Sequence, residues 1–157
     1  MGLVAYIARH GNTITINLPI AFSGGDQETY NAMAMAIHSN WTGQSGQYNV
    51  TTNVIDGTHL TTWATNTVTV LPGNGIAEFA RGAGGLSKTT NSRHGDWYAA
   101  PTRGQCLDYA HEAGHLMGLG EWNDIPNLMN QNATTSDVYP AVIEAILASP
   151  NNVLLNP

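Results

Sequence analysis

The chain has 157 residues, of which 42% are hydrophobic and only 10% are charged. This length suits one domain, residues 1–157, that can bury a sizeable core. The net charge is −6 with five basic residues spread along the chain, so we expect no nucleic-acid partner, which would need a basic stripe. No apolar run approaches the roughly 18 residues of a membrane-spanning helix, so we also expect no membrane role.

Several short segments alternate apolar with polar residues and are bounded by Gly, Asn or Pro, a pattern typical of strands. In the second of them, Ile14, Ile16 and Leu18 share one face, because successive side chains of a strand point to opposite sides. The predicted strands cover residues 3–9, 13–22, 48–55, 66–71, 76–80 and 96–99.

Three other segments repeat apolar residues every three or four positions, which predicts helices. The first has Asp26 as its N-cap, and we expect its Met33 and Met35 to lie in the core. The second begins near Thr102, in a Thr-x-x-Gln capping box, and should close at Gly118, because glycine accepts the left-handed conformation. The predicted helices cover residues 26–41, 102–118 and 136–148.

The second helix carries a His111-Glu112-x-x-His115 motif. Residues four apart lie on one helix face, so the two imidazoles can bind one metal ion. Glu112 lies about 100° round the helix, where its carboxylate flanks the position of a metal-bound water. Zinc lowers the pKa of such a water to about 7, and a nearby carboxylate can then take its proton as the water attacks a carbonyl. The spacing therefore predicts a zinc (Zn²⁺) site with Glu112 as general base in peptide hydrolysis.

A third ligand is expected from the chain that follows Gly118 as it turns back toward the metal. Glu121 and Asp124 are both candidates, because two histidines and a carboxylate form an established catalytic zinc set. A separate arrangement would take the ligand from a downstream helix, where Glu144 is the available residue, but no supporting motif surrounds it.

Other polar residues are expected to lie outside the site. His10 and His59 have no partner at ligand spacing. His94 and Asp96, just before a predicted strand, are more typical of a loop surface than of a second ion site. We expect Tyr139 to pack within the final helix rather than to serve the metal.

The motif resembles that of the metzincin clan of zinc endopeptidases, His-Glu-x-x-His-x-x-Gly-x-x-His, in which Asp replaces the last residue in some members. The match is residue for residue at all four fixed positions from His111 to Gly118. Glu121 stands where the clan has its third ligand, so the resemblance favours Glu121 over Asp124. A glutamate at that position departs from the clan's pattern and leaves the third ligand as the point to check.

Asn127-Leu128-Met129-Asn130 follows the motif after a short loop and resembles the clan's methionine turn. The resemblance implies that Met129 forms an apolar floor under the metal without binding it. It also implies the fold class: an α+β (α/β) metzincin-like zincin fold. Such a fold has a twisted, mostly parallel sheet with an antiparallel edge strand, a backing helix, the metal-binding helix and a C-terminal helix.

By the same resemblance, the segment at residues 75–80 is expected to be the edge strand that lines the substrate cleft. An extended peptide can pair its backbone with such an edge, which gives binding that does not depend on its sequence. Buried strand residues would show the same pattern, so this assignment stays open. The residues concerned are Ile76, Ala77, Glu78 and Phe79.

The expected function is that of a zinc-dependent endopeptidase acting on protein or peptide substrates. The chain also resembles the exchangeable toxin modules of bacterial polymorphic secretion systems, which implies delivery outside the producing cell and a cognate inhibitor or immunity protein as partner. Its low charge is common in secreted proteins, although the chain itself contains no export signal. A catalytically silent binding module is the remaining alternative.

Overall fold

The computed structural model describes residues 5–61, 64–72, 88–90, 94–99, 105–131, 135–150 and 152–155. They form a mixed α+β fold with three helices, which are α1 (Gln27–Asn40), α3 (Gln105–Leu116) and α4 (Pro140–Ala148). The strands are β1 (Tyr6–His10), β2 (Thr13–Ser23), β3 (Gly43–Ser45), β4 (Tyr48–Asp56), β5 (Asn66–Leu71), β6 (Lys88–Thr90), β7 (His94–Tyr98) and β8 (Val153–Leu155).

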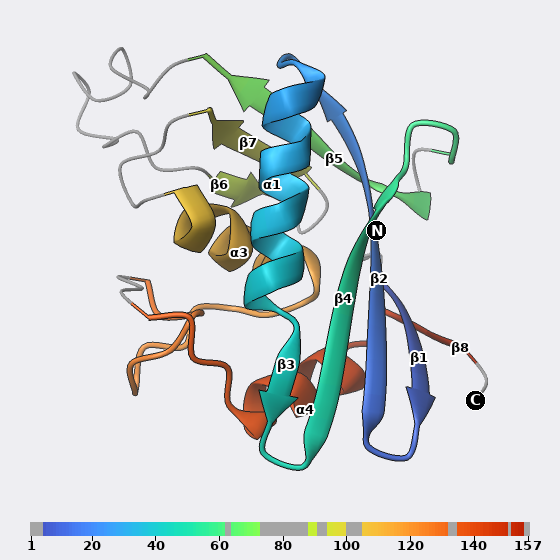
Figure 1. Cartoon of the computed structure of the whole chain (residues 1–157), viewed down its shortest axis with the longest axis vertical. Helices are drawn as coiled ribbons and strands as arrows, with labels where there is room; N and C mark the ends of the chain where they lie inside the picture. Colours follow the sequence, from blue (N-terminus) through green and yellow to red (C-terminus); the bar gives the residue numbers. More distant parts are fainter. Residues whose placement is uncertain are drawn as a thin grey trace.

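The strands make one mixed sheet in the order β3-β4-β2-β5-β7-β6 (Figure 1). Its centre is parallel, since β2 pairs in parallel with β4 and β5, and β5 with β7. Each end of this order is antiparallel, because β3 pairs with β4 and β6 with β7 in opposite directions. The long β2 shares one of its edges between β5 and β1, and β8 pairs in parallel with β1. The expected mostly parallel sheet is therefore observed as a mixed sheet with a parallel centre.

The core lies between one face of the sheet and the helices. Alternate residues of β2 point into it, and Ile14, Ile16 and Leu18 are fully buried, as the alternation predicted. On the opposite face of β2, Thr15 and Asn17 are only half-buried. Figure 1 shows α1 lying across the sheet, with α3 beside it and the closing helix α4 near the β3–β4 end.

Helix α1 begins and ends as the sequence predicted. The Asp26 carboxylate accepts a hydrogen bond of 2.8 Å from the Thr29 amide, and this bond lowers the pKa of Asp26. Met33 is fully buried, but the expectation that Met35 is also in the core is wrong, because its side chain is 61% exposed. A helix turns by about 200° over two residues, so Met35 faces away from the core in which Met33 is buried.

The structure corrects several other boundaries. Helix α4 begins at Pro140 instead of residue 136, because proline suits the first helical position, where no amide hydrogen is needed. Tyr139 is its N-cap and so lies outside the helix. Strand β7 begins at His94, so His94 and Asp96 lie on a strand and not on a loop. The predicted strand at residues 76–80 and the predicted helix start at Thr102 lie outside the described residues.

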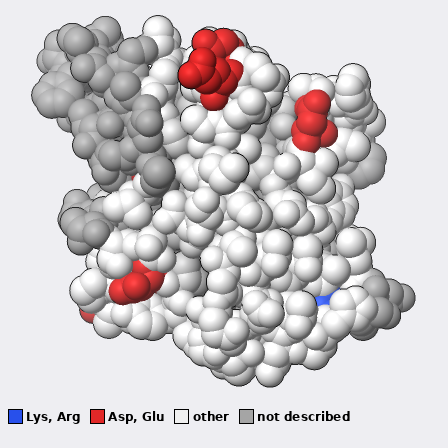
Figure 2. Space-filling view, in the orientation of Figure 1, with Lys and Arg blue, Asp and Glu red and all other residues white. Residues whose placement is uncertain are grey.

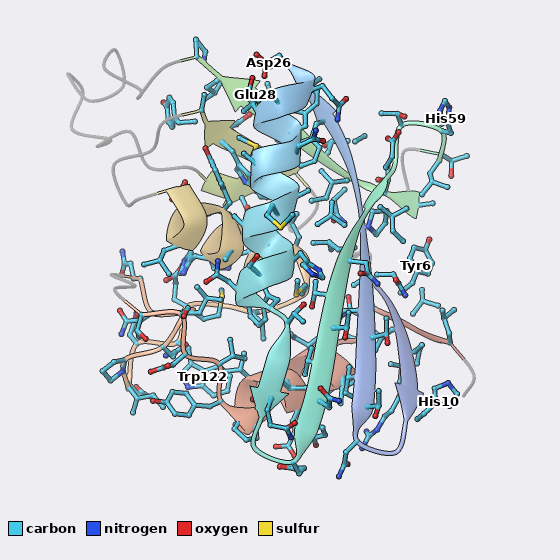
Figure 3. All side chains as sticks on the ribbon, viewed as in Figure 1. Tyr6, His10, Asp26, Glu28, His59 and Trp122 are labelled. Atoms are coloured by element: carbon cyan, nitrogen blue, oxygen red, sulfur yellow. The ribbon has the colours of Figure 1, made fainter. Side chains whose placement is uncertain are left out.

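Charged side chains are sparse on the face shown in Figure 2, in keeping with the low charged fraction of the chain. One acidic group on this face lies at the start of α1, where Figure 3 labels Asp26 and Glu28. None of the helices in the described part of the chain is long and apolar enough to cross a membrane.

Candidate metal centre

Helix α3 presents the two motif histidines to one point. His111 and His115 lie one turn apart, with ring centroids separated by 4.9 Å and ring planes at 86° to each other. The His111 side chain is 1% exposed and the His115 side chain 19% exposed. His115 is therefore the more accessible of the two rings to solvent.

The end of α3 turns the chain back over this face. Gly118 has a φ of 104°, the left-handed conformation expected of it. The Leu119 amide donates to the Gly114 carbonyl at 3.0 Å, which closes the last turn of the helix. The following residues therefore run back beside the histidines instead of away from them.

Glu121 completes the group. Its Oε1 atom lies 3.1 Å from Nε2 of His111 and 2.8 Å from Nε2 of His115. One ligand atom from each of the three residues falls within 4.8 Å of the other two, close enough to bind one metal ion. The structure thus brings together the two histidines and the glutamate that the resemblance favoured as third ligand.

The two other candidates for the third ligand are not in this group. Asp124 is exposed on the same loop, and among the described residues the group holds only His111, His115 and Glu121. Glu144 is engaged elsewhere, since its Oε2 accepts a hydrogen bond of 2.9 Å from the Tyr48 hydroxyl. That bond raises the pKa of Tyr48, because it stabilises the protonated hydroxyl.

Backbone carbonyls orient both imidazoles. Nδ1 of His111 lies 2.8 Å from the Leu128 carbonyl oxygen, and Nδ1 of His115 lies 2.8 Å from the Leu119 carbonyl oxygen. A carbonyl oxygen can only accept, so each Nδ1 carries the hydrogen and donates it. In a neutral ring the other nitrogen, Nε2, then presents a lone pair toward Glu121.

Three electron-pair donors therefore converge, two Nε2 atoms and one carboxylate oxygen. A divalent cation satisfies all three at once, and this combination of outward Nδ1–H bonds and inward Nε2 atoms is the one that metal-binding histidines use. The donor set of this structure consequently fits a metal ion.

Glu112 lies beside the group without belonging to it. The residue is 4% exposed, and its carboxylate is not among the three ligand atoms that converge. Its backbone carbonyl accepts a hydrogen bond of 3.2 Å from the Thr89 hydroxyl on β6. The edge strand β6 is therefore tied to α3 at the residue expected to act as general base.

The loop after α3 is closed by pairing between its two ends. The Trp122 amide donates to the Met129 carbonyl at 2.8 Å, and the side-chain amide of Asn127 donates to the Trp122 carbonyl at 2.9 Å. Met129 is fully buried, and a Cβ atom on Gly114 of α3 would collide with its sulfur. The methionine therefore packs against the motif helix, and its expected role as a floor under a metal ion stays a prediction.

The remaining polar candidates lie away from the metal group. Figure 3 shows His10 and His59 on the side of the molecule opposite α3. On β7, His94 contacts Thr67 through Nδ1 at 2.8 Å and Asp96 through Nε2 at 3.1 Å. Tyr139 is 38% exposed, and its hydroxyl donates to the Pro126 carbonyl at 3.2 Å. The predicted edge residues Ile76, Ala77, Glu78 and Phe79 lie outside the described residues.

Sequence reasoning missed the parts of the site that hold the ligands in place. The carbonyls of Leu119 and Leu128 have no sequence signal, because every residue carries one. Thr89 lies in a polar stretch and carries no signal of its own, and Asn127 stands out in the sequence only as the first residue of the segment that resembles the methionine turn. No family model and no curated protein sequence matches this chain.

Proposed function

We propose that this protein is a zinc-dependent endopeptidase of the metzincin type. The observation that carries the proposal is the convergence of His111, His115 and Glu121, with both Nδ1 atoms held by carbonyls. Two histidines and a glutamate form an established catalytic zinc set. When bound there, zinc supplies the Lewis acidity that makes water nucleophilic near neutral pH and polarises a substrate carbonyl.

Glu112 is the general base in this proposal. By helix geometry, its position next to His111 on α3 would put its carboxylate on the flank of the ligand group, and its burial would keep bulk water away from it. The carboxylate takes a proton from the attacking water and then delivers it to the departing amine. This division of roles needs a carboxylate that stays outside the ligand set, which is the arrangement around Glu112.

The order of elements supports the resemblance on which the proposal also rests. The clan's parallel sheet centre with an antiparallel end strand corresponds to β4-β2-β5-β7-β6, and its helix across the sheet corresponds to α1. Its ligand-carrying helix corresponds to α3 and its closing helix to α4. Met129 below Gly114 corresponds to the methionine floor. The acidic third ligand remains the departure from the clan's pattern.

The position of strand β6 supports binding of an extended peptide substrate along the edge of the sheet. It ends the described sheet, runs antiparallel to β7 and lies against α3 through the bond from Thr89 to Glu112. Among the described residues, β6 pairs on one side only, with β7. An extended peptide paired with its other edge would run past the ligand group, so that its backbone carbonyls would come near the metal and the base. The predicted edge at Ile76–Phe79 remains a separate prediction.

The test of this proposal is the Glu112→Gln variant, which keeps the shape of the side chain and removes its ability to accept a proton. We expect it to retain one zinc per chain and to lose hydrolysis of a peptide library by about 10²–10⁴-fold, the range that general-base catalysis contributes. Wild-type activity should disappear with a chelator and return with zinc.

The matched control is Asp124→Asn, which removes an exposed carboxylate from the same loop. It should leave both zinc content and hydrolysis unchanged. Full activity in Glu112→Gln would refute the proposed role of Glu112. Zinc binding by the wild type without any cleavage would favour the silent binding module instead.

A further inference from the structure

The loop that carries Glu121 contains a buried side-chain amide, that of Asn127, which is 1% exposed. We propose that Asn127 is a positioning residue that sets the third ligand, Glu121, against the ring of His111. The inference rests on the proposed metal site and concerns how this chain builds it.

One half of the amide controls the part of the loop next to Glu121. Nδ2 of Asn127 donates to the Trp122 carbonyl at 2.9 Å and to the Ile125 carbonyl at 2.7 Å. Trp122 directly follows Glu121 in the chain, and Figure 3 labels it in this loop. Holding the Trp122 carbonyl therefore limits where the Glu121 backbone can lie, and with it the reach of the carboxylate.

The other half controls the part of the loop that orients His111. Oδ1 of Asn127 accepts a hydrogen bond of 2.8 Å from the Met129 amide. The peptide group that contains this amide also contains the Leu128 carbonyl, which accepts from Nδ1 of His111 at 2.8 Å. Because a peptide group is planar, fixing its N–H direction also fixes the direction of its carbonyl.

The amide thus connects two features of the metal group that α3 alone does not relate. His111 belongs to the helix, whereas Glu121 belongs to the loop. The distance of 3.1 Å between Nε2 of His111 and Oε1 of Glu121 therefore depends on the conformation of the loop. Only a side chain with both an acceptor and two donor hydrogens can make all three bonds of Asn127. An aspartate of the same shape keeps the acceptor but turns the two donor bonds into repulsive contacts with carbonyl oxygens.

The test compares Asn127→Asp with Asn66→Asp, a matched change at a fully buried asparagine of β5 whose Nδ2 donates to the Pro19 carbonyl at 2.9 Å. Zinc affinity is measured by competition with a chelating indicator, and ligand geometry is measured from the visible spectrum of the Co²⁺ form. Stability is measured by urea unfolding of the two variants in their metal-free form. We expect Asn127→Asp to bind zinc about 10–100-fold more weakly and to show an altered Co²⁺ spectrum. Asn66→Asp should keep wild-type zinc affinity and spectrum while losing stability.

Wild-type zinc affinity and Co²⁺ spectrum in Asn127→Asp would overturn the inference, because the amide would then be an ordinary structural residue. Should Asn127→Asp fail to fold, the same measurements on Asn127→Ser decide, and failure of both to fold would also overturn it, since Asn127 would then be required for the fold itself. A wild-type protein that binds no zinc would instead contradict the proposed function. The two failures are therefore distinguishable.

Discussion

Leu119 and Leu128 each present a backbone carbonyl to Nδ1 of a motif histidine, and this leaves both Nε2 atoms directed at Glu121. The spacing of the motif predicted which side chains meet, because helix geometry alone places two histidines on one face. The carbonyl acceptors could not be predicted, since they depend on how the loop folds back. At the scale of single residues, the sequence therefore indicates the candidate ligands and the structure shows what orients them.

Glu121 is the residue whose role departs from the clan's pattern, and its contribution can be measured directly. Replacing it in Glu121→Ala removes one of three ligands, so zinc affinity should fall by more than about a hundredfold, a loss larger than that from disturbing an outer partner. Asp124→Ala should retain wild-type affinity, because its carboxylate lies outside the group. Zinc content after dialysis against a weak chelator checks both variants, and an equal or greater loss in Asp124→Ala would exchange their roles.

At the scale of elements, α3 and the loop that follows it are fitted together at Gly114. A Cβ atom there would collide with the sulfur of Met129 and would lie 3.0 Å from Trp41, whose indole nitrogen also donates to the Ala110 carbonyl at 2.8 Å. The glycine therefore lets α1, α3 and the methionine turn approach closely. The fit explains why the small residue stands between Glu112 and His115.

This fit predicts a specific loss of stability. Gly114→Ala should destabilise the protein by about 1–3 kcal/mol through overpacking, despite the higher helix propensity of alanine. Gly120→Ala is the control, because a Cβ atom at that position meets nothing within 4 Å. Urea unfolding measures both, and adding Met129→Ala to Gly114→Ala should cost less than the sum of the two single changes. Additive losses would mean that Gly114 and Met129 are not in the contact described.

Length decided which elements the sequence could predict. Strands β2, β4 and β5 and helix α1 are long enough to show a period, and their bounds were predicted to within a residue or two. Strands β3, β6 and β8 have three residues each and were missed, since three positions cannot show an alternation. Met35 shows that hydrophobicity alone does not predict burial on a helix, because this methionine is 61% exposed.

At the scale of the whole molecule, the order of strands is the information that local patterns did not carry. Strand β6 lies at the end of the sheet beside α3, and β8 pairs with β1 from the far part of the chain. Neither pairing follows from local periodicity, because both depend on long-range packing. The general expectation of a sheet backed by helices was nevertheless confirmed as a mixed α+β fold.

We expect one divalent cation to bind among His111, His115 and Glu121. An anomalous difference map at the zinc absorption edge, from crystals grown with equimolar zinc, tests it most directly. We expect one peak per chain at about 2.0–2.2 Å from both Nε2 atoms and a Glu121 oxygen. A map without a peak between these three side chains would contradict the proposed metal site.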